Sequence, residues 1–117
     1  MKKILIVDDD NELRLSLGEI LINNGFSPAL ASSGRLAINL FTQERPDAVL
    51  LDLNMPDMNG IEAAIHIRGF LPGCKILLFS GQAATADLLE NARERGYEFQ
   101  ILAKPVHPQD LLAKLRE

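Results

Sequence analysis

Residues 4–10 read ILIVDDD, an apolar run that passes directly into three consecutive acids. Residues 48–52, AVLLD, repeat the pattern with a single acid. Two further apolar runs also end in side chains that can react or bind ligands: ILLF (76–79) before Ser80, and QILA (100–103) before Lys104-Pro105. If the four runs are parallel strands, their ends meet along one edge of one sheet, where open α/β sheets bind ligands.

Such an edge would crowd carboxylates together. Two carboxylates in contact repel by roughly 4 kcal/mol at an effective dielectric near 20, so a cluster of them calls for a cation. Ligands that offer only oxygen suit Mg²⁺. Mg²⁺, a lone carboxylate, a hydroxyl and an ammonium together indicate a site that handles a phosphoryl group.

Length and composition predict one domain over residues 1–117, with an ordinary globular balance of 47% hydrophobic and 24% charged residues. The net charge of −4 argues against direct binding of nucleic acid by this domain. A single cysteine, Cys74, excludes an internal disulfide and is read as a small structural residue. The apolar run after Lys2-Lys3 stops at Val7, too short for a secretory core, and no stretch is long enough to span a membrane. A cytoplasmic protein is expected.

Five strand-like runs alternate with five segments of helical period. The expected strands lie at about 3–7, 27–31, 47–51, 75–79 and 99–103. The expected helices run from about Leu13 to Asn24-Gly25, over 36–41, over 61–68 after Asn59 as N-cap, over 83–95, and from Pro108. This alternation predicts an α/β fold, a doubly wound five-stranded parallel sheet with helices on both faces.

The chain resembles the receiver domain of bacterial two-component response regulators over essentially its whole length. Four stretches carry the resemblance, namely ILIVDD at 4–9, DLNMPDMNG at 52–60, Ser80-Gly81 and Lys104-Pro105. Each short stretch alone is weak evidence for the family, whereas the nine residues from Asp52 are specific to it. All four stretches in this order are highly specific. The resemblance implies a flavodoxin-like sheet of strand order 2-1-3-4-5.

The resemblance also implies the site residues. Asp52 is the expected phosphoacceptor, because a carboxylate can attack a phosphoryl group held in line. Mg²⁺ is the expected cofactor, with Asp9 as a direct ligand, Asp8 acting largely through bound water, Asp52 itself as a ligand, and Asn54 offering its backbone carbonyl.

Ser80 is expected to hydrogen-bond a phosphoryl oxygen, and Gly81 leaves room for that group to approach the backbone. Lys104 is expected to pair with Asp52 before phosphorylation and with the phosphoryl group afterwards, and the family's Lys-Pro peptide is cis. The family also tunes hydrolysis at the positions of Asn54 and Gln82.

Other polar residues have simpler interpretations. Asp10 is expected to cap the first helix, and Asp57 is read as a loop acid. His66 and His107 lack a second metal ligand at useful spacing and are expected to be exposed, without a role in the site.

Two departures from the family pattern affect signal relay. The family usually has Tyr or Phe three residues before the lysine, where this chain has Ile101. The segment from Gly96 to Lys104 is also one residue longer than the common pattern. Phe99 lies two residues before Ile101 and is a possible substitute, because alternate residues of a strand share a face.

The predicted function is a phospho-switch. It would accept a phosphoryl group from a sensor histidine kinase or phosphotransfer protein, and would catalyse only its own phosphorylation and dephosphorylation. It would then act on a downstream target or output domain through the face built from 83–117, with homodimerisation on phosphorylation as a possibility and no membrane contact.

Three alternatives stay open at this point. A degenerate receiver could act as a constitutive binding module. An aspartyl-nucleophile phosphatase would typically have a second Asp where this chain has Asn54. A flavodoxin-like flavin carrier would need a phosphate-binding loop after the first strand, where Asp8-Asp9-Asp10 would repel phosphate.

Overall fold

The computed structural model describes residues 2–53, 55, 59–81 and 85–117. Strands and helices alternate along the chain, as the sequence predicts. The strands are β1 (Lys3–Val7), β2 (Ser27–Ala31), β3 (Ala48–Asp52), β4 (Lys75–Ser80) and β5 (Gln100–Ala103). The helices are α1 (Asn11–Asn23), α2 (Gly34–Glu44), α3 (Gly60–Phe70), α4 (Thr85–Glu94) and α5 (Pro108–Leu115). None of the helices in this part of the chain has the length and apolar character that crossing a membrane requires.

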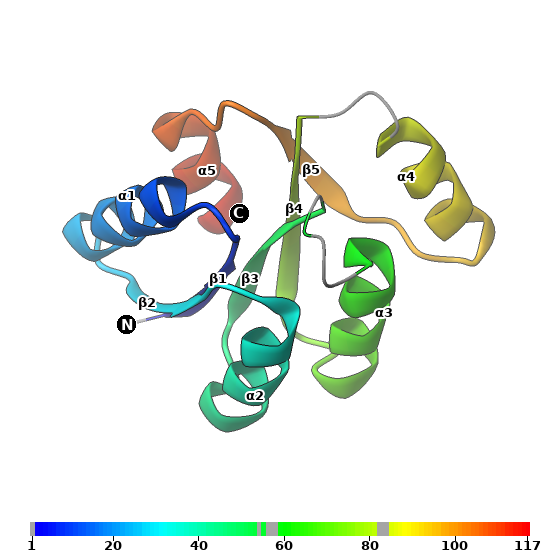
Figure 1. Ribbon diagram of the computed structural model, residues 1–117, viewed down its shortest axis with the longest axis horizontal. Coiled ribbons are helices and arrows are strands. Elements are labelled where there is room, and N and C mark those ends of the chain that lie inside the picture. The colour runs from blue at the N-terminus through cyan, green and yellow to red at the C-terminus, as the bar shows by residue number, and fades with distance from the viewer. Residues whose placement is uncertain (1, 54, 56–58, 82–84) are drawn as a thin grey trace.

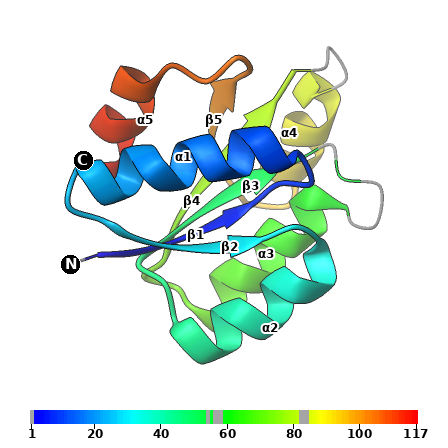
Figure 2. The same ribbon diagram turned by 60° about the vertical axis from the view of Figure 1, so that its left-hand side comes forward.

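The five strands form one parallel sheet in the order β2-β1-β3-β4-β5, which confirms the predicted topology. Helices α1 and α5 cover one face, and α2, α3 and α4 cover the other (Figures 1 and 2). β1 and β3 are neighbours at the centre of the sheet. Their carboxyl ends therefore lie side by side, where the acids of both predicted motifs meet.

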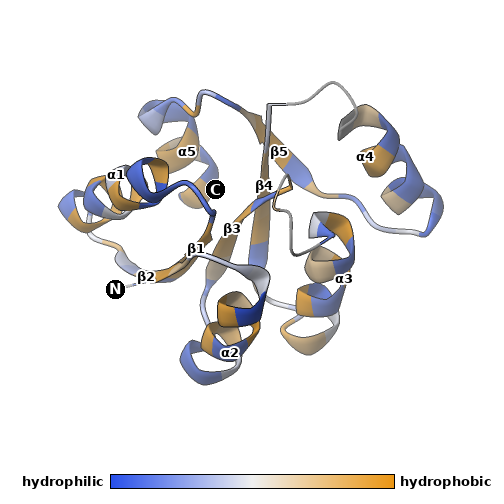
Figure 3. Cartoon of the chain, viewed as in Figure 1, coloured by the Kyte–Doolittle hydropathy of each residue, from blue (hydrophilic) through white to orange (hydrophobic). Residues whose placement is uncertain are grey.

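The central strands β1, β3 and β4 are buried on both faces because their alternate residues enter different cores. In β1, Leu5 and Val7 pack in the cluster that faces α2, α3 and α4. Ile4 and Ile6 pack in the cluster that faces α1 and α5. Figure 3 shows the strands largely in the hydrophobic colour, between helices of mixed colour. Double burial explains why these strands read as continuous apolar runs.

The strand ends differ slightly from the sequence prediction. β3 extends through Asp52, one residue beyond the predicted end, and β4 extends through Ser80. The ladder continues because the N–H of Leu53 donates to the carbonyl of Phe79 at 3.0 Å. β5 begins at Gln100, one residue later than predicted. Asp52 and Ser80 are thus held by sheet pairing and are not the first residues of free loops.

The helix boundaries follow local capping chemistry. The Asp10 side chain accepts a hydrogen bond from the Leu13 N–H at 3.2 Å, which confirms it as the N-cap of α1. Asn59 caps α3 as predicted, accepting from the backbone N–H groups of Ile61 and Glu62 at 3.0 and 3.2 Å. The observed α4 covers Thr85–Glu94, and residues 83 and 84 of the predicted helix lie outside the described part.

Candidate functional site

Asp8, directly after β1, is fixed on three sides. Its N–H donates to the Ala31 carbonyl at 3.1 Å, and its carbonyl accepts from Arg14 Nη1 at 2.8 Å. Its Oδ1 accepts from the Asp10 N–H at 2.9 Å. Asp8 has 0% exposure, and its Oδ2 has no hydrogen-bond partner in the described part of the chain. This buried oxygen lies at the sheet edge and forms an ion pair with the Lys104 ammonium at 3.4 Å.

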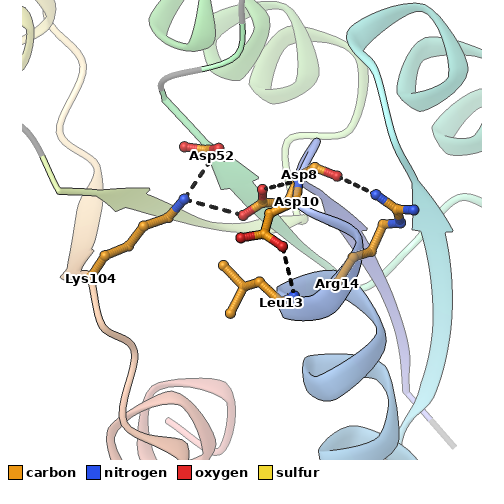
Figure 4. Close-up of polar contacts among 6 residues, drawn as sticks. All are labelled: Asp8, Asp10, Leu13, Arg14, Asp52 and Lys104. Atoms are coloured by element: carbon orange, nitrogen blue, oxygen red, sulfur yellow. Dashed lines mark hydrogen bonds and ion pairs between the residues drawn. The ribbon is translucent and has the colours of Figure 1, made fainter.

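Lys104 joins the two central strands electrostatically (Figure 4). Its Nζ lies 3.3 Å from Oδ2 of Asp52 and 3.4 Å from Oδ2 of Asp8. The Lys104 backbone N–H donates to the Ser80 carbonyl at 3.0 Å, and the Lys104-Pro105 peptide is cis, as the resemblance implies. Asp52 is 2% exposed and Ser80 is 6% exposed. The structure therefore brings the predicted hydroxyl, ammonium and carboxylates to the same sheet edge.

Burial and neighbouring charges shift the pKa values of both Asp8 and Lys104. Burial raises the pKa of the Asp8 carboxyl above its ordinary value of 3.8, and the charge of Asp52 raises it further. The Asp10 N–H and the Lys104 ammonium act in the other direction on the pKa of Asp8 without cancelling the rise. Burial lowers the pKa of Lys104, but Asp52 and Asp8 outweigh burial and leave its pKa above 10.5. One ammonium therefore compensates two buried carboxylates only in part, and further positive charge would stabilise them.

Asp9 completes a group of three carboxylates. Oxygens of Asp8, Asp9 and Asp52 all lie within 4.8 Å of one another. Asp9 is exposed, while the other two acids are buried. An all-oxygen ligand set with an open side to solvent fits Mg²⁺, which keeps several of its waters when bound to protein. Asn54, the predicted carbonyl ligand, lies outside the described residues.

The two histidines and the cysteine, for which the sequence predicts no role in the site, lie apart from the carboxylate cluster. His66 is exposed on α3, with its ring edge-on to Phe41 at 6.0 Å between centroids. It borders an apolar cavity of about 260 Å³ between α2 and α3, a feature that the sequence does not predict. His107 is exposed at the start of α5. Burial, with a smaller contribution from Asp47, raises the pKa of the Cys74 thiol to about 11, which supports its structural interpretation.

Asp57 and Gln82 lie outside the described residues. Gly81 follows β4 and is exposed, and a Cβ added there would meet only the Cβ of Lys104 at an ordinary 3.5 Å. Sequence patterns do not single out Arg14, the group that holds the Asp8 carbonyl. An arginine six residues after an acid could face either way on α1, so only the structure reveals this contact.

Ile101, which departs from the family pattern, and Phe99, its proposed substitute, both pack on the core facing α2, α3 and α4. Ile101 lies in β5 and is partly buried there. Phe99 is also partly buried but precedes β5, so the two residues do not share a strand as predicted. The Arg68 guanidinium lies 4.8 Å from the centroid of the Phe99 ring, and Tyr97 stacks on that ring at 6.2 Å. The Phe99 ring thus contacts both Arg68 and Tyr97, whereas the Ile101 side chain contributes apolar packing.

Comparisons with known proteins agree with this geometry. A sequence model of the response regulator receiver domain matches residues 4–116. The response regulator MprA of Mycolicibacterium vanbaalenii is 35% identical over 114 residues, which are 97% of this chain and 48% of the relative. The chemotaxis protein CheY of Thermotoga maritima is 32% identical over 117 residues, which cover 99% of this chain and 96% of the relative.

Solved structures show the same architecture. A CheY-like receiver domain from Methanospirillum hungatei superposes with a TM-score of 0.89 at 30% identity, covering 99% of this chain and 91% of that one. A receiver domain from Clostridium thermocellum superposes with a TM-score of 0.88 at 27% identity, covering 99% and 92%.

The chain spans about half the length of the MprA relatives that it matches, and nearly the full length of CheY. The family match over almost the whole sequence does not favour the phosphatase or flavin-carrier alternatives. Sheet order, acidic edge and sequence similarity lead to one conclusion: the chain belongs to the response regulator receiver domain family.

Proposed function

We propose that this receiver domain accepts a phosphoryl group on Asp52 in a reaction that depends on Mg²⁺. The observation that carries the proposal is the Lys104 ammonium between the buried carboxylates of Asp52 and Asp8, beside the exposed acid Asp9. An arrangement that serves only folding would gain little from keeping two acids at the buried ends of central strands.

The residues present fit a divalent cation. Asp8, Asp9 and Asp52 would hold Mg²⁺. The buried Asp8 Oδ2, which has an ion pair with Lys104 but no hydrogen bond in the described part of the chain, supports this assignment. When bound, the ion would supply positive charge to the carboxylates and to the oxygens of the phosphoryl donor. The backbone carbonyl of Asn54 is the proposed further ligand from this chain.

The transfer is a displacement at phosphorus. A carboxylate oxygen of Asp52 forms a bond to phosphorus, the bond from phosphorus to the donor's imidazole nitrogen breaks, and an acyl phosphate results. Lys104 would turn from the Asp52 carboxylate to the phosphoryl oxygens, and the Ser80 hydroxyl would donate to one of them. Hydrolysis would reverse the modification, so the chain would act chemically only on itself.

The partners follow from this chemistry. The donor would be a sensor histidine kinase or a phosphotransfer protein that carries phosphohistidine. The phosphorylated state would act on a downstream target or an output domain through the face built from 83–117, with self-association on phosphorylation as one possible output. The relatives named MprA are about twice as long as this chain, which leaves room for an output domain in them.

Intact mass spectrometry tests the proposal. Incubation with Mg²⁺ and acetyl phosphate should add one phosphoryl group to the wild type and none to Asp52→Asn. Asp10→Asn is a matched control, because Asn caps a helix as well as Asp and leaves the three carboxylates in place.

Phosphorylation of Asp10→Asn at the wild-type level is expected. An unmodified wild type that also fails to bind fluoroberyllate would instead support the degenerate-receiver alternative. Fluoroberyllate is a suitable probe because a solved receiver domain of this fold is described as activated by it, at a TM-score of 0.84 and 27% identity.

A further inference from the structure

Arg14 closes the acidic turn between β1 and α1 from both sides. Its backbone N–H donates to the Asp10 carbonyl at 3.0 Å, as part of the first turn of the helix. Its side chain reaches back, and Nη1 donates to the Asp8 carbonyl at 2.8 Å while Nη2 contacts Oδ1 of Asn11. Figure 4 shows the guanidinium on the far side of Asp8 from Lys104.

The carbonyl that Arg14 binds belongs to the peptide between Asp8 and Asp9. Rotation of that peptide would turn the carbonyl away and swing the Asp9 side chain at the same time. The other polar groups of Asp8 are already held, since its N–H binds Ala31 and its Oδ1 binds the Asp10 N–H. The Arg14 hydrogen bond therefore fixes the one peptide that relates the buried acid to the exposed acid.

We propose that Arg14 is a positioning residue for the divalent cation, holding the Asp8–Asp9 peptide so that both carboxylates face the metal site. This inference rests on the proposed function, because it concerns the same cation. Groups that orient metal ligands typically contribute about 10- to 100-fold to metal affinity. Asn11 assists by engaging the second arm of the planar guanidinium.

A purely electrostatic role predicts the opposite outcome. Arg14 is a cation close to an acidic site, so its charge alone weakens the binding of a second cation. Removing that charge without any positioning effect would tighten Mg²⁺ binding. The direction of the change in affinity therefore distinguishes positioning from simple charge.

The experiment is a titration of the ¹⁵N-labelled full chain with MgCl₂, followed by the amide shifts of Asp9 and Asp10. Three variants are compared with the wild type: Arg14→Met, Arg14→Lys and the control Arg35→Met, which removes an exposed arginine of α2. Arg14→Met should raise the Mg²⁺ Kd about tenfold. The Mg²⁺ Kd of Arg14→Lys should lie between those of Arg14→Met and the wild type. An ammonium keeps the positive charge but lacks the planar, two-armed donor geometry of a guanidinium. Arg35→Met should stay within about twofold of the wild type, because screening weakens distant charges.

Urea unfolding with chelator, done in parallel, separates stability from affinity. A lower stability with an unchanged Kd in Arg14→Met would make the residue merely structural and overturn the inference, as would tighter binding. If Arg14→Met does not fold, the Mg²⁺ Kd of Arg14→Lys is the test, and a Kd equal to that of the wild type overturns the inference. Failure of the wild type itself to bind Mg²⁺ would overturn the proposed metal site, and the role of Arg14 with it.

Discussion

Gly60 begins α3 at the point where the helix passes against Leu53, the residue after Asp52. A Cβ at position 60 would lie 2.6 Å from Cδ2 and 2.9 Å from Cα of Leu53. The Leu53 side chain can move, but its Cα belongs to the backbone that carries the proposed phosphoacceptor. The absence of a side chain at position 60 thus allows the end of β3 and the start of α3 to approach.

Gly60→Ala should lower the free energy of unfolding by about 1–3 kcal/mol, the usual cost of overpacking. Gly69→Ala is the control within the same helix, because a Cβ there meets nothing within 4 Å. That variant should gain about 0.5–1 kcal/mol, since Ala favours helix over Gly. Chemical denaturation measures both, and a Gly60→Ala variant as stable as Gly69→Ala would contradict the close approach.

Asp9 is the exposed member of the carboxylate group, so its charge can be removed without leaving a cavity. With chelator present, Asp9→Ala should be more stable than the wild type, because it relieves repulsion by Asp8 and Asp52. The effect should be modest, about 1 kcal/mol or less, because solvent screens an exposed charge. The same variant should lose the stabilisation that Mg²⁺ confers on the wild type. Thermal unfolding with and without Mg²⁺ checks both, and a full Mg²⁺ response in Asp9→Ala would place the ion elsewhere.

At the scale of elements, α4 is the helix held by the fewest apolar side chains among its described residues. Ala92 is fully buried, Leu89 is partly buried, and Leu88 is 38% exposed. Little apolar surface must be exposed to shift such a helix, which suits it to two alternative positions. Ser80 ends the strand that leads toward α4, so a phosphoryl group that engages Ser80 could bias the helix.

Fluoroberyllate binding should therefore change amide shifts strongly over the described residues of 80–105. Ser80→Ala should reduce these changes strongly, because it removes the hydroxyl that would engage the phosphoryl group. Ile101→Ala should reduce them only weakly, because Ile101 has no hydroxyl and is smaller than the usual aromatic residue. Two-dimensional NMR of the wild type and both variants is the measurement. An equal collapse in Ile101→Ala would make aliphatic packing at that position part of the relay.

Sequence patterns predicted the elements well because their causes are local. Asp10, Asn59 and the double-sided apolar runs act within a few residues of themselves, so their effects can be read directly. The strand ends at Asp52 and Ser80 were each missed by one residue, because pairing with a neighbouring strand decides where a ladder stops. Phe99 was also predicted inside a strand that begins one residue later, and its ring contacts Arg68 of α3, a residue distant in the sequence.

For the candidate site, the sequence predicted which chemical groups would gather, and the structure added how they are held. Parallel strand ends bring Asp8 and Asp52 side by side on neighbouring strands, whereas Lys104 follows β5, two strands from β3, and reaches both acids through its long side chain. The orientation of the Asp8–Asp9 peptide depends instead on the Arg14 side chain, a contact that no periodicity encodes. The acids also differ in burial, and only the folded structure distinguishes buried Asp8 from exposed Asp9.

For the molecule as a whole, the acidic edge links metal binding and pH to the stability of the entire domain. The pKa of Asp8 in the folded protein is above 3.8, so the folded chain binds this proton more tightly than the unfolded chain does. That contribution to stability is fully present below about pH 3.8 and is lost as pH rises through the folded pKa. The pKa of Lys104 is above 10.5, so its contribution is lost only in strong alkali. Above the folded pKa of Asp8, the cost of its ionisation is offset by Lys104 only in part, and a further cation would offset more of it.

Mg²⁺ should therefore stabilise the domain increasingly as pH rises from about 4 to about 7.5. Protons compete with the ion for Asp8 at low pH, and this competition weakens as the pH rises through the raised pKa of the folded state. At ten times the Kd measured at neutral pH, the gain should reach about 1.4 kcal/mol, a rise of a few degrees in Tm for a domain of this size. Calorimetric scans across this pH range, with Mg²⁺ or with chelator, give the difference in Tm at each pH. Asp8→Asn should show a small difference at every pH, because Asn has no proton for the ion to displace and no charge to offer it. A gain in Tm that is constant across the range, or that persists in Asp8→Asn, would mean that the ion stabilises the fold from a site other than this sheet edge.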